Sequence, residues 1–352
     1  MDDAYILLAR RLNELPNGFP STQDGVELRL LEKLFTPEDA RLAAGLRLEL
    51  ETPEEIKTRL GSDDPELRQK LKSMARQGLI NVGKVDGSLG YGLLPFVVGI
   101  YEMQVSRLDE ELAGLFEEYF QKGFGQILAI QPAVHRVIPV RESIRMDMEI
   151  HPYESAASII GGAAAWGVLD CICRKQKMLV GDPCEHPLDV CLALSQTPGA
   201  FDNNSVIRAL TQEQALETLH RAARAGLVHS SSNTRDGASY ICNCCTCSCG
   251  ILRGLAELGI SNAVARSAFV NTVNEELCIA CADCLPSCQF DALSLGEFIQ
   301  VDRNHCVGCG VCILSCPEGA LQLERRPDSE IMPVPADEHE WQVQRLENRE
   351  LN

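Results

Sequence analysis

The stretch Cys278-Ile-Ala-Cys281-Ala-Asp-Cys284-Leu-Pro-Ser-Cys288 decides how this chain is interpreted, because its spacing returns later in the sequence. The second run is Cys306-Val-Gly-Cys309-Gly-Val-Cys312-Ile-Leu-Ser-Cys316. Each run is followed by a similar tail of alternating apolar residues, at 292–295 and 320–323. The two C-x2-C-x2-C-x3-C runs therefore form an internal repeat that supplies eight thiols.

Residues 271–324 closely resemble a bacterial two-cluster ferredoxin, in which such runs bind two 4Fe-4S clusters. In that family the fourth Cys of each run reaches the other cluster. The resemblance implies one cluster on Cys278, Cys281, Cys284 and Cys316, and a second on Cys288, Cys306, Cys309 and Cys312. Zinc ribbons also contain C-x2-C pairs, but two symmetric runs with the x3 spacer favour iron–sulfur clusters.

Residues beside the thiols fit the same pattern, with one departure. Gly308 and Gly310 suit a loop whose backbone amides approach cluster sulfurs without a Cβ in the way. Pro317 follows the second run as the pattern requires, whereas Gln289 follows the first. The departure leaves ligation unaffected and is expected to change only the local rigidity.

Nine further thiols lie in the middle of the chain. They are Cys171, Cys173, Cys184, Cys191, Cys242, Cys244, Cys245, Cys247 and Cys249. Thiols this dense in a reducing cell are typical of metal centres, although any single one could be a buried core residue. We predict an additional metal centre here, a third iron–sulfur cluster in preference to zinc, and spacing alone does not decide which thiols bind it.

The surroundings of these thiols give local expectations. The apolar run ending in Cys171 and Cys173 reads as a strand that points both side chains to one face. Cys184 and Cys191 are assigned to a loop and the start of a helix, and a further helix is expected from Ile251. Arg174 is expected to offset thiolate charge or to donate hydrogen bonds to cluster sulfur.

Two histidines lie near the central thiols, His186 and His229. Each is a candidate metal ligand, although a solvent-facing or satisfied core histidine is the favoured interpretation for both. The chain also contains no G-x-x-x-x-G-K-[ST] motif and no G-x-G-x-x-G after a strand, so the sequence offers no recognisable nucleotide or flavin site.

The N-terminal region predicts helices followed by a hairpin. An apolar stripe at helical spacing starts at Val26, and Thr-Pro pairs at 36–37 and 52–53 mark two further helix starts. Pro65 is expected to open a last helix before a glycine-rich turn at 86–90. This order looks like a regulator-type winged-helix domain.

The last of these helices has a modest basic face, formed by Arg68, Lys70, Lys72 and Arg76. Residues 1–100 nevertheless carry 13 basic and 16 acidic side chains, which disfavours binding to DNA phosphates. We therefore expect the domain to contact proteins. A related tail recurs at 223–227, after a Thr211-x-x-Gln214 pattern that predicts a capping box.

The composition limits the remaining possibilities. The 352 residues include 32 Lys and Arg against 50 Asp and Glu, a formal charge of −18, so a basic partner protein is favoured over nucleic acid. The first 20 residues do not read as an export signal, and no uncharged run reaches the ~20 residues of a membrane span. We expect a cytoplasmic protein with reduced thiols.

The whole arrangement resembles uncharacterised proteins of anaerobes, and the expected fold class is α+β. The expected parts are an N-terminal segment (1–20), a winged-helix-like domain (21–105), a Cys-rich α/β middle domain with a second helix and wing (106–270), a dicluster ferredoxin domain (271–324) and an acidic tail (325–352) that is mobile or wraps a partner. The predicted function is electron transfer between redox partner proteins through two 4Fe-4S clusters. The alternatives are a redox-sensing winged-helix regulator of transcription and an enzyme with an open central metal site.

Overall fold

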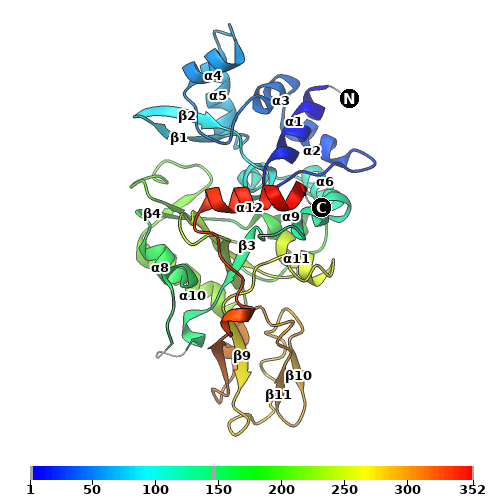
Figure 1. Ribbon diagram of the computed structural model, residues 1–352, viewed down its shortest axis with the longest axis vertical. Helices are drawn as coiled ribbons and strands as arrows, with labels where there is room; N and C mark the ends of the chain where they lie inside the picture. The colour runs from blue at the N-terminus through cyan, green and yellow to red at the C-terminus, as the bar shows by residue number, and fades with distance from the viewer. Residues whose placement is uncertain (1–2, 145–147, 351–352) are drawn as a thin grey trace. The chain divides into compact units, whose positions relative to one another are not determined.

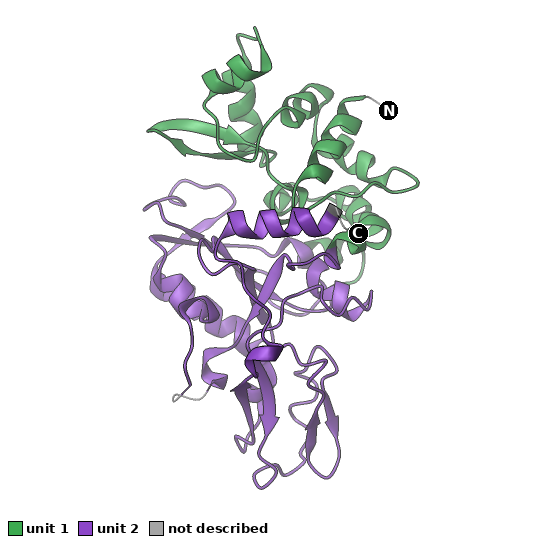
Figure 2. Ribbon diagram, in the orientation of Figure 1, with its two compact units in different colours: residues 1–127, 175–182 green, residues 128–174, 183–352 purple. Residues whose placement is uncertain are grey.

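A computed structural model describes residues 3–144 and 148–350 of the protein. The chain forms two compact units, residues 1–127 with 175–182 and residues 128–174 with 183–352 (Figure 2). Both units mix helices with antiparallel strands (Figure 1), which confirms the expected α+β class. No helix in the described ranges is both long enough and apolar enough to cross a membrane.

The first unit is mainly helical, and a β-hairpin follows its first five α-helices. Its main elements are α1 (Asp3–Glu14), α2 (Val26–Leu34), α3 (Pro37–Ala44), α4 (Pro53–Leu60), α5 (Leu67–Arg76), β1 (Asn81–Val85), β2 (Ser88–Gly92) and α6 (Glu110–Tyr119). The predicted order of helices and hairpin is therefore present. Whether the domain functions as a winged helix stays a prediction.

Local capping explains where these helices begin. The Thr36 hydroxyl accepts from Asp39 N at 3.2 Å, and Thr52 forms a reciprocal capping box with Glu55. The predicted start at Pro65 is wrong by two residues, because the Asp64 carboxylate accepts from Glu66 N at 2.8 Å and holds the chain in a turn there.

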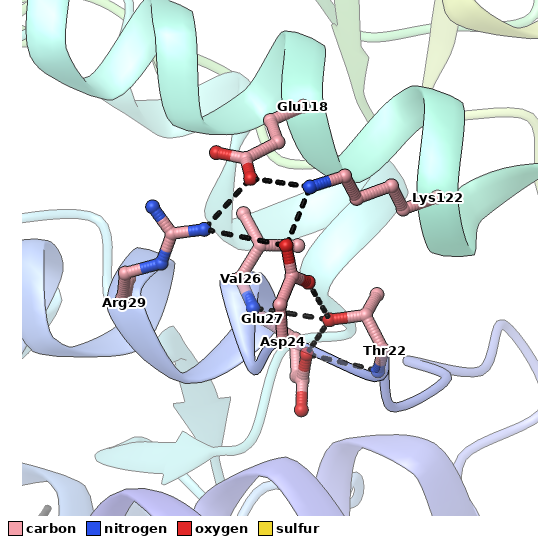
Figure 3. A network of polar contacts seen from close by, with 7 residues as sticks. All are labelled: Thr22, Asp24, Val26, Glu27, Arg29, Glu118 and Lys122. Atoms are coloured by element: carbon pink, nitrogen blue, oxygen red, sulfur yellow. Dashed lines mark hydrogen bonds and ion pairs between the residues drawn. The ribbon is translucent and has the colours of Figure 1, made fainter.

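A polar network fixes the start of α2 within the first unit (Figure 3). The Thr22 hydroxyl accepts from Val26 N at 3.0 Å. Lys122 Nζ pairs with Asp24, in the turn before α2, and with Glu118 on α6 at 2.6 Å. Because the lysine joins two carboxylates from different elements, it ties the entry of α2 to the end of α6.

The second unit is built on a six-stranded antiparallel sheet in the order β3-β7-β8-β5-β4-β6. The strands are β3 (His135–Ile138), β4 (Ala165–Leu169), β5 (Cys191–Ser195), β6 (Arg208–Leu210), β7 (Val228–Ser232) and β8 (Tyr240–Cys244). Helices α8 (Ala156–Gly161) and α10 (Gln212–Arg224) supply Ile160, Ala215 and Leu219 to a core with Leu192 and Ile241 of the sheet. The predicted capping box of Thr211 and Gln214 starts α10.

Two expectations about the central thiols are wrong. Strand β4 ends at Leu169, and Cys173 lies on α9 (Ile172–Leu179), because Cys171 N donates to Leu188 O at 2.8 Å and draws the chain out of the sheet. Cys191 begins β5 and not a helix, since it pairs with Leu169 in the ladder. The helix expected from Ile251 is present as α11 (Gly250–Ala256).

The eight-thiol repeat lies between two small antiparallel pairs of strands. β9 (Phe269–Val273) pairs with β12 (Leu321–Arg325), and β10 (Leu293–Leu295) pairs with β11 (Ile299–Val301). β10 and β12 are the two apolar tails of the repeat. The sequence repeat is thus also a repeat of loop followed by strand.

The acidic tail is ordered in the described residues, so the expectation of a mobile segment is wrong. Its helix α12 (Glu338–Glu350) buries Trp341 and Arg345 almost completely. Trp341 Nε1 donates to Ala133 O at 3.0 Å, and Arg345 donates to Pro132 O at 2.7 Å. These two side chains hold the helix against the segment that leads into β3.

Candidate metal centres

The first candidate centre is a small cavity lined by thiols from both runs. Cys278, Cys281 and Cys284 come from the first run, and Cys316 comes from the second. Cys284 is buried, whereas Cys281 is exposed. Burial and the nearby Cys316 and Cys281 raise the pKa of Cys284, so bare thiolates repel one another here and a positive metal would relieve that repulsion.

The remaining four thiols form a second, more deeply buried neighbourhood. Burial, with repulsion from Cys306 and Cys288, raises the pKa of Cys309 to about 12. Burial also raises the pKa of Cys312, whose nearest charged neighbours include Cys309, Cys288 and Cys306. Cys288 of the first run also packs against a small core cluster that contains Cys306 of the second run.

The two loops share an unusual backbone conformation. Gly308 and Gly310 have positive φ angles of 72° and 76°, and Ala280 and Ala282 at the matching positions have 55° and 67°. A Cβ on Gly308 would lie 2.1 Å from Phe269 O, so this position requires glycine for space as well as for φ. The first loop adopts the same conformation at a cost, since a left-handed alanine is strained by about 1–2 kcal/mol.

Hydrogen bonds to sulfur also repeat. Ala292 N donates to Cys288 Sγ at 3.4 Å, and Ala320 N donates to Cys316 Sγ at 3.2 Å. Asn271 Nδ2 adds a donor to Cys312 Sγ at 3.4 Å, which the sequence gave no reason to expect. Donors of this kind stabilise the negative sulfur of a bound cluster and raise its reduction potential.

Six of the nine central thiols form a ring, in which three are buried and three are half-buried. These are Cys171, Cys173, Cys191, Cys242, Cys244 and Cys249. Side-chain hydrogen bonds shift the pKa of each of three of these thiols through two neighbours: Cys171 through Cys173 and Cys191, Cys242 through Cys191 and Cys244, and Cys249 through Cys173 and Cys244. Cys242 and Cys244 share a face of β8, because they are two residues apart on one strand.

Arg174 lies beside this ring and is almost completely buried. Its guanidinium donates to Pro187 O at 2.8 Å and to Asn243 O. Burial opposes its charge, but Cys171 and Cys245 outweigh that effect and raise its pKa. Among the described residues its Nε has no hydrogen-bond partner, so the predicted role of Arg174 beside thiolate or cluster sulfur fits its position.

The other three central thiols gather with a histidine. The ligand atoms of Cys184, His186, Cys245 and Cys247 all lie within 4.8 Å of one another. A hydrogen bond from Cys247 and the nearby His186 lower the pKa of Cys245 to about 3, despite its burial. The same contacts with Cys245 and Cys184 raise the pKa of His186 to about 9.

The two histidines lie in different surroundings. His229 is buried in the core and hydrogen bonded to Asn243 Oδ1, as expected. His186 belongs to a group with metal-ligand spacing, which matches the alternative that the sequence left open and not its favoured interpretation. The signal was available in the short pairs Cys184-x-His186 and Cys245-x-Cys247.

A family model described as a 4Fe-4S binding domain matches residues 299–322. The chain carries a 4Fe-4S binding motif of ferredoxin type. The matched segment contains all four thiols of the second run. No curated protein and no solved structure matches the chain.

Proposed function

We propose that the protein is an electron carrier that holds two 4Fe-4S clusters on the crossed ligand sets and passes single electrons between protein partners. The observation that carries the proposal is the cavity in which Cys316 joins Cys278, Cys281 and Cys284. Thiols from opposite ends of the repeat meet there, as crossed ligation requires. Cys288 stands beside Cys306 and Cys309 in the complementary arrangement.

The two sites differ in their access to a partner. At the first site Cys281 is exposed, and the neighbouring Leu277 and Ile279 are 47% and 65% exposed. At the second site Cys306 and Cys312 are buried. An exposed apolar rim around a charged cluster suits the docking of another redox protein, because such contacts exclude water where the electron crosses. The first cluster is therefore the proposed entry or exit point.

The charge of the chain supports a particular kind of partner. With a formal charge of −18, the protein attracts surfaces rich in Lys and Arg and repels other acidic proteins. We propose partners with a basic docking face, whose association slows as salt is added.

The test is anaerobic purification of the full chain followed by iron, sulfide and electron paramagnetic resonance measurements. The two cubes predict about eight iron atoms and eight sulfides for these sites, and a reducible signal from two interacting clusters. A protein whose eight ferredoxin thiols bind zinc, or bind a single cluster of about four iron atoms, would refute the proposal.

One observation bears on the alternative function, a DNA-binding regulator. Arg68, Lys72 and Arg76 are exposed on α5, whereas Lys70 is paired with Asp64 at 2.8 Å. Three free cations are few for a DNA face. Fluorescence anisotropy against DNA upstream of the gene, with clusters intact and near physiological salt, separates the two functions. Tight, sequence-specific binding that changes with cluster oxidation would favour the regulator.

A further inference from the structure

The group formed by Cys184, His186, Cys245 and Cys247 has the size of a site for one metal ion. Cys184 Sγ lies 3.7 Å from Cys245 Sγ and 3.2 Å from Cys247 Sγ, and His186 Nδ1 lies 2.9 Å from Cys184 Sγ. Around a tetrahedral zinc with bonds of about 2.3 Å, two thiolates stand about 3.8 Å apart. An iron–sulfur cube would hold its thiolates farther apart, because its own atoms stand between them.

The chain builds this group from two separate segments. Cys184 and His186 lie in the loop between α9 and β5, and Cys245 and Cys247 lie in the turn that follows β8. Val190, Ala222 and Leu227 pack around Cys245 as a small apolar base. The turn and the loop thus meet at the four candidate ligands, beside this apolar base.

We propose that Cys184, His186, Cys245 and Cys247 bind a single tetrahedral metal ion of the zinc class, separate from any iron–sulfur cluster. Three thiolates and one imidazole are a ligand set that zinc prefers, and a complete set of four protein ligands is typical of a structural site. The earlier preference for a third iron–sulfur cluster does not apply to these four residues. The six-thiol ring is a different group, and it shares no residue with this site.

The site also holds the loop that follows the first ferredoxin run. Thr246, between two of the ligands, donates its backbone N–H to Gln289 Oε1 at 2.7 Å, and Gln289 Nε2 donates to Gly226 O. Gln289 directly follows Cys288 and stands where the second run has Pro317. A metal ion that fixes Cys245 and Cys247 therefore also fixes the Thr246 amide that donates to Gln289. Ion binding is independent of the proposed electron transfer, whereas an effect on Cys288 as a cluster ligand rests on it.

The test measures zinc and iron together in the anaerobically purified full chain. We expect about one zinc ion per chain in addition to iron. His186→Ala and Cys247→Ala should each lose that zinc and keep their iron. His220→Ala, which removes an exposed histidine on α10, should keep both metals. Cys281→Ala should lose iron and keep zinc, so failure of this proposal is distinguishable from failure of the proposed function.

A second measurement uses the unmodified protein, so it does not depend on whether the variants fold. Zinc-edge X-ray absorption of the unmodified protein should show three sulfur ligands at about 2.3 Å and one nitrogen at about 2.0–2.1 Å. Zinc retained at the wild-type level in both His186→Ala and Cys247→Ala would overturn the proposal. So would iron lost in place of zinc, or a zinc environment without nitrogen.

Discussion

The ferredoxin repeat and the central region are both rich in cysteine, but they bring their thiols together in different ways. In the repeat, burial is the first cause of the raised pKa of Cys309 and Cys312. In the central region, hydrogen bonds between thiols are the first cause of the shifts of Cys171 and Cys242. Local loops therefore hold the thiols of the repeat around a small cavity. The central thiols instead come together from strands and loops that are distant in sequence.

The largest effects are expected from removing one thiol from each of the two four-thiol sites of the ferredoxin repeat. Cys309→Ala should lose about four of about eight iron atoms and destabilise the fold, because Cys309 lies in the more buried site. Cys281→Ala should lose a similar amount of iron with less effect on the fold, since Cys281 is exposed. Iron analysis with anaerobic denaturant unfolding separates the two effects. Equal destabilisation by both variants would contradict the difference between the sites.

In the central region the largest single effect is expected from Arg174→Met. The change removes a buried cation from among thiols and leaves the carbonyls of Pro187 and Asn243 without their donor. We expect a loss of about 3–5 kcal/mol in the free energy of unfolding. Arg224→Met, an exposed arginine at the end of α10, should change it by less than about 0.5 kcal/mol. Similar values for both variants would show that the thiols near Arg174 carry little negative charge.

Gly308→Ala tests the loop that the repeat requires. The added Cβ meets Phe269 O and adopts an unfavourable φ, so we expect a cost of about 2–4 kcal/mol. The measurement is the temperature at which the brown absorbance expected of bound iron–sulfur clusters is lost under anaerobic conditions. Gly319→Ala is the matched control, because its φ is also positive but no atom lies within 4 Å of the added Cβ. A larger effect at Gly319 than at Gly308 would exclude the steric explanation.

Gln289→Ala tests the connection between the two regions. The variant loses the hydrogen bonds to Thr246 N and Gly226 O, and we expect a cost of about 1–3 kcal/mol with the iron content unchanged. Faster hydrogen exchange at the Thr246 amide is the direct measurement. Gln300→Ala, on the exposed face of β11, is the control. Unchanged exchange at Thr246 would show that the turn is held without Gln289.

The smallest expected effect is a gain. Ala280→Gly relieves a left-handed alanine and should stabilise the first loop by about 0.5–1 kcal/mol after the entropy cost of glycine. The measurement is again the temperature of chromophore loss. A lower temperature in the variant would mean that the Ala280 methyl group makes contacts worth more than the strain it imposes.

The sequence predicted the ferredoxin motif because its ligands lie close together along the chain and their spacing is itself the signal. For the group of Cys184, His186, Cys245 and Cys247 the sequence shows only two short pairs, and that they meet depends on where the turn after β8 reaches a loop some 60 residues earlier. The rule that residues two apart share a strand face was applied to Cys171 and Cys173, where the strand has already ended. It holds for Cys242 and Cys244.

Polar side chains that lie near cysteine sulfur were predictable only when they stand next to a cysteine motif in the sequence. Arg174 was expected beside sulfur because it follows Cys173 in the sequence. Asn271 reaches Cys312 only through the pairing of β9 with β12, which brings together residues about 50 positions apart. The folding of the tail was also missed, because its composition is polar and, among the described residues of its helix, just Trp341 and Arg345 are buried.

The exposure of Cys281 determines where oxygen is expected to damage the protein first. Oxidants reach a metal–thiolate bond at the surface before they reach one behind packed side chains, so damage begins where solvent touches sulfur. In the proposed two-cluster arrangement, the iron bound by Cys281 would be the atom most open to attack, because Cys281 is exposed whereas Cys306 and Cys312 are buried. If the protein holds the two proposed clusters, brief exposure to oxygen would damage the cluster at Cys281 first and leave the cluster at Cys306 and Cys312 intact for longer.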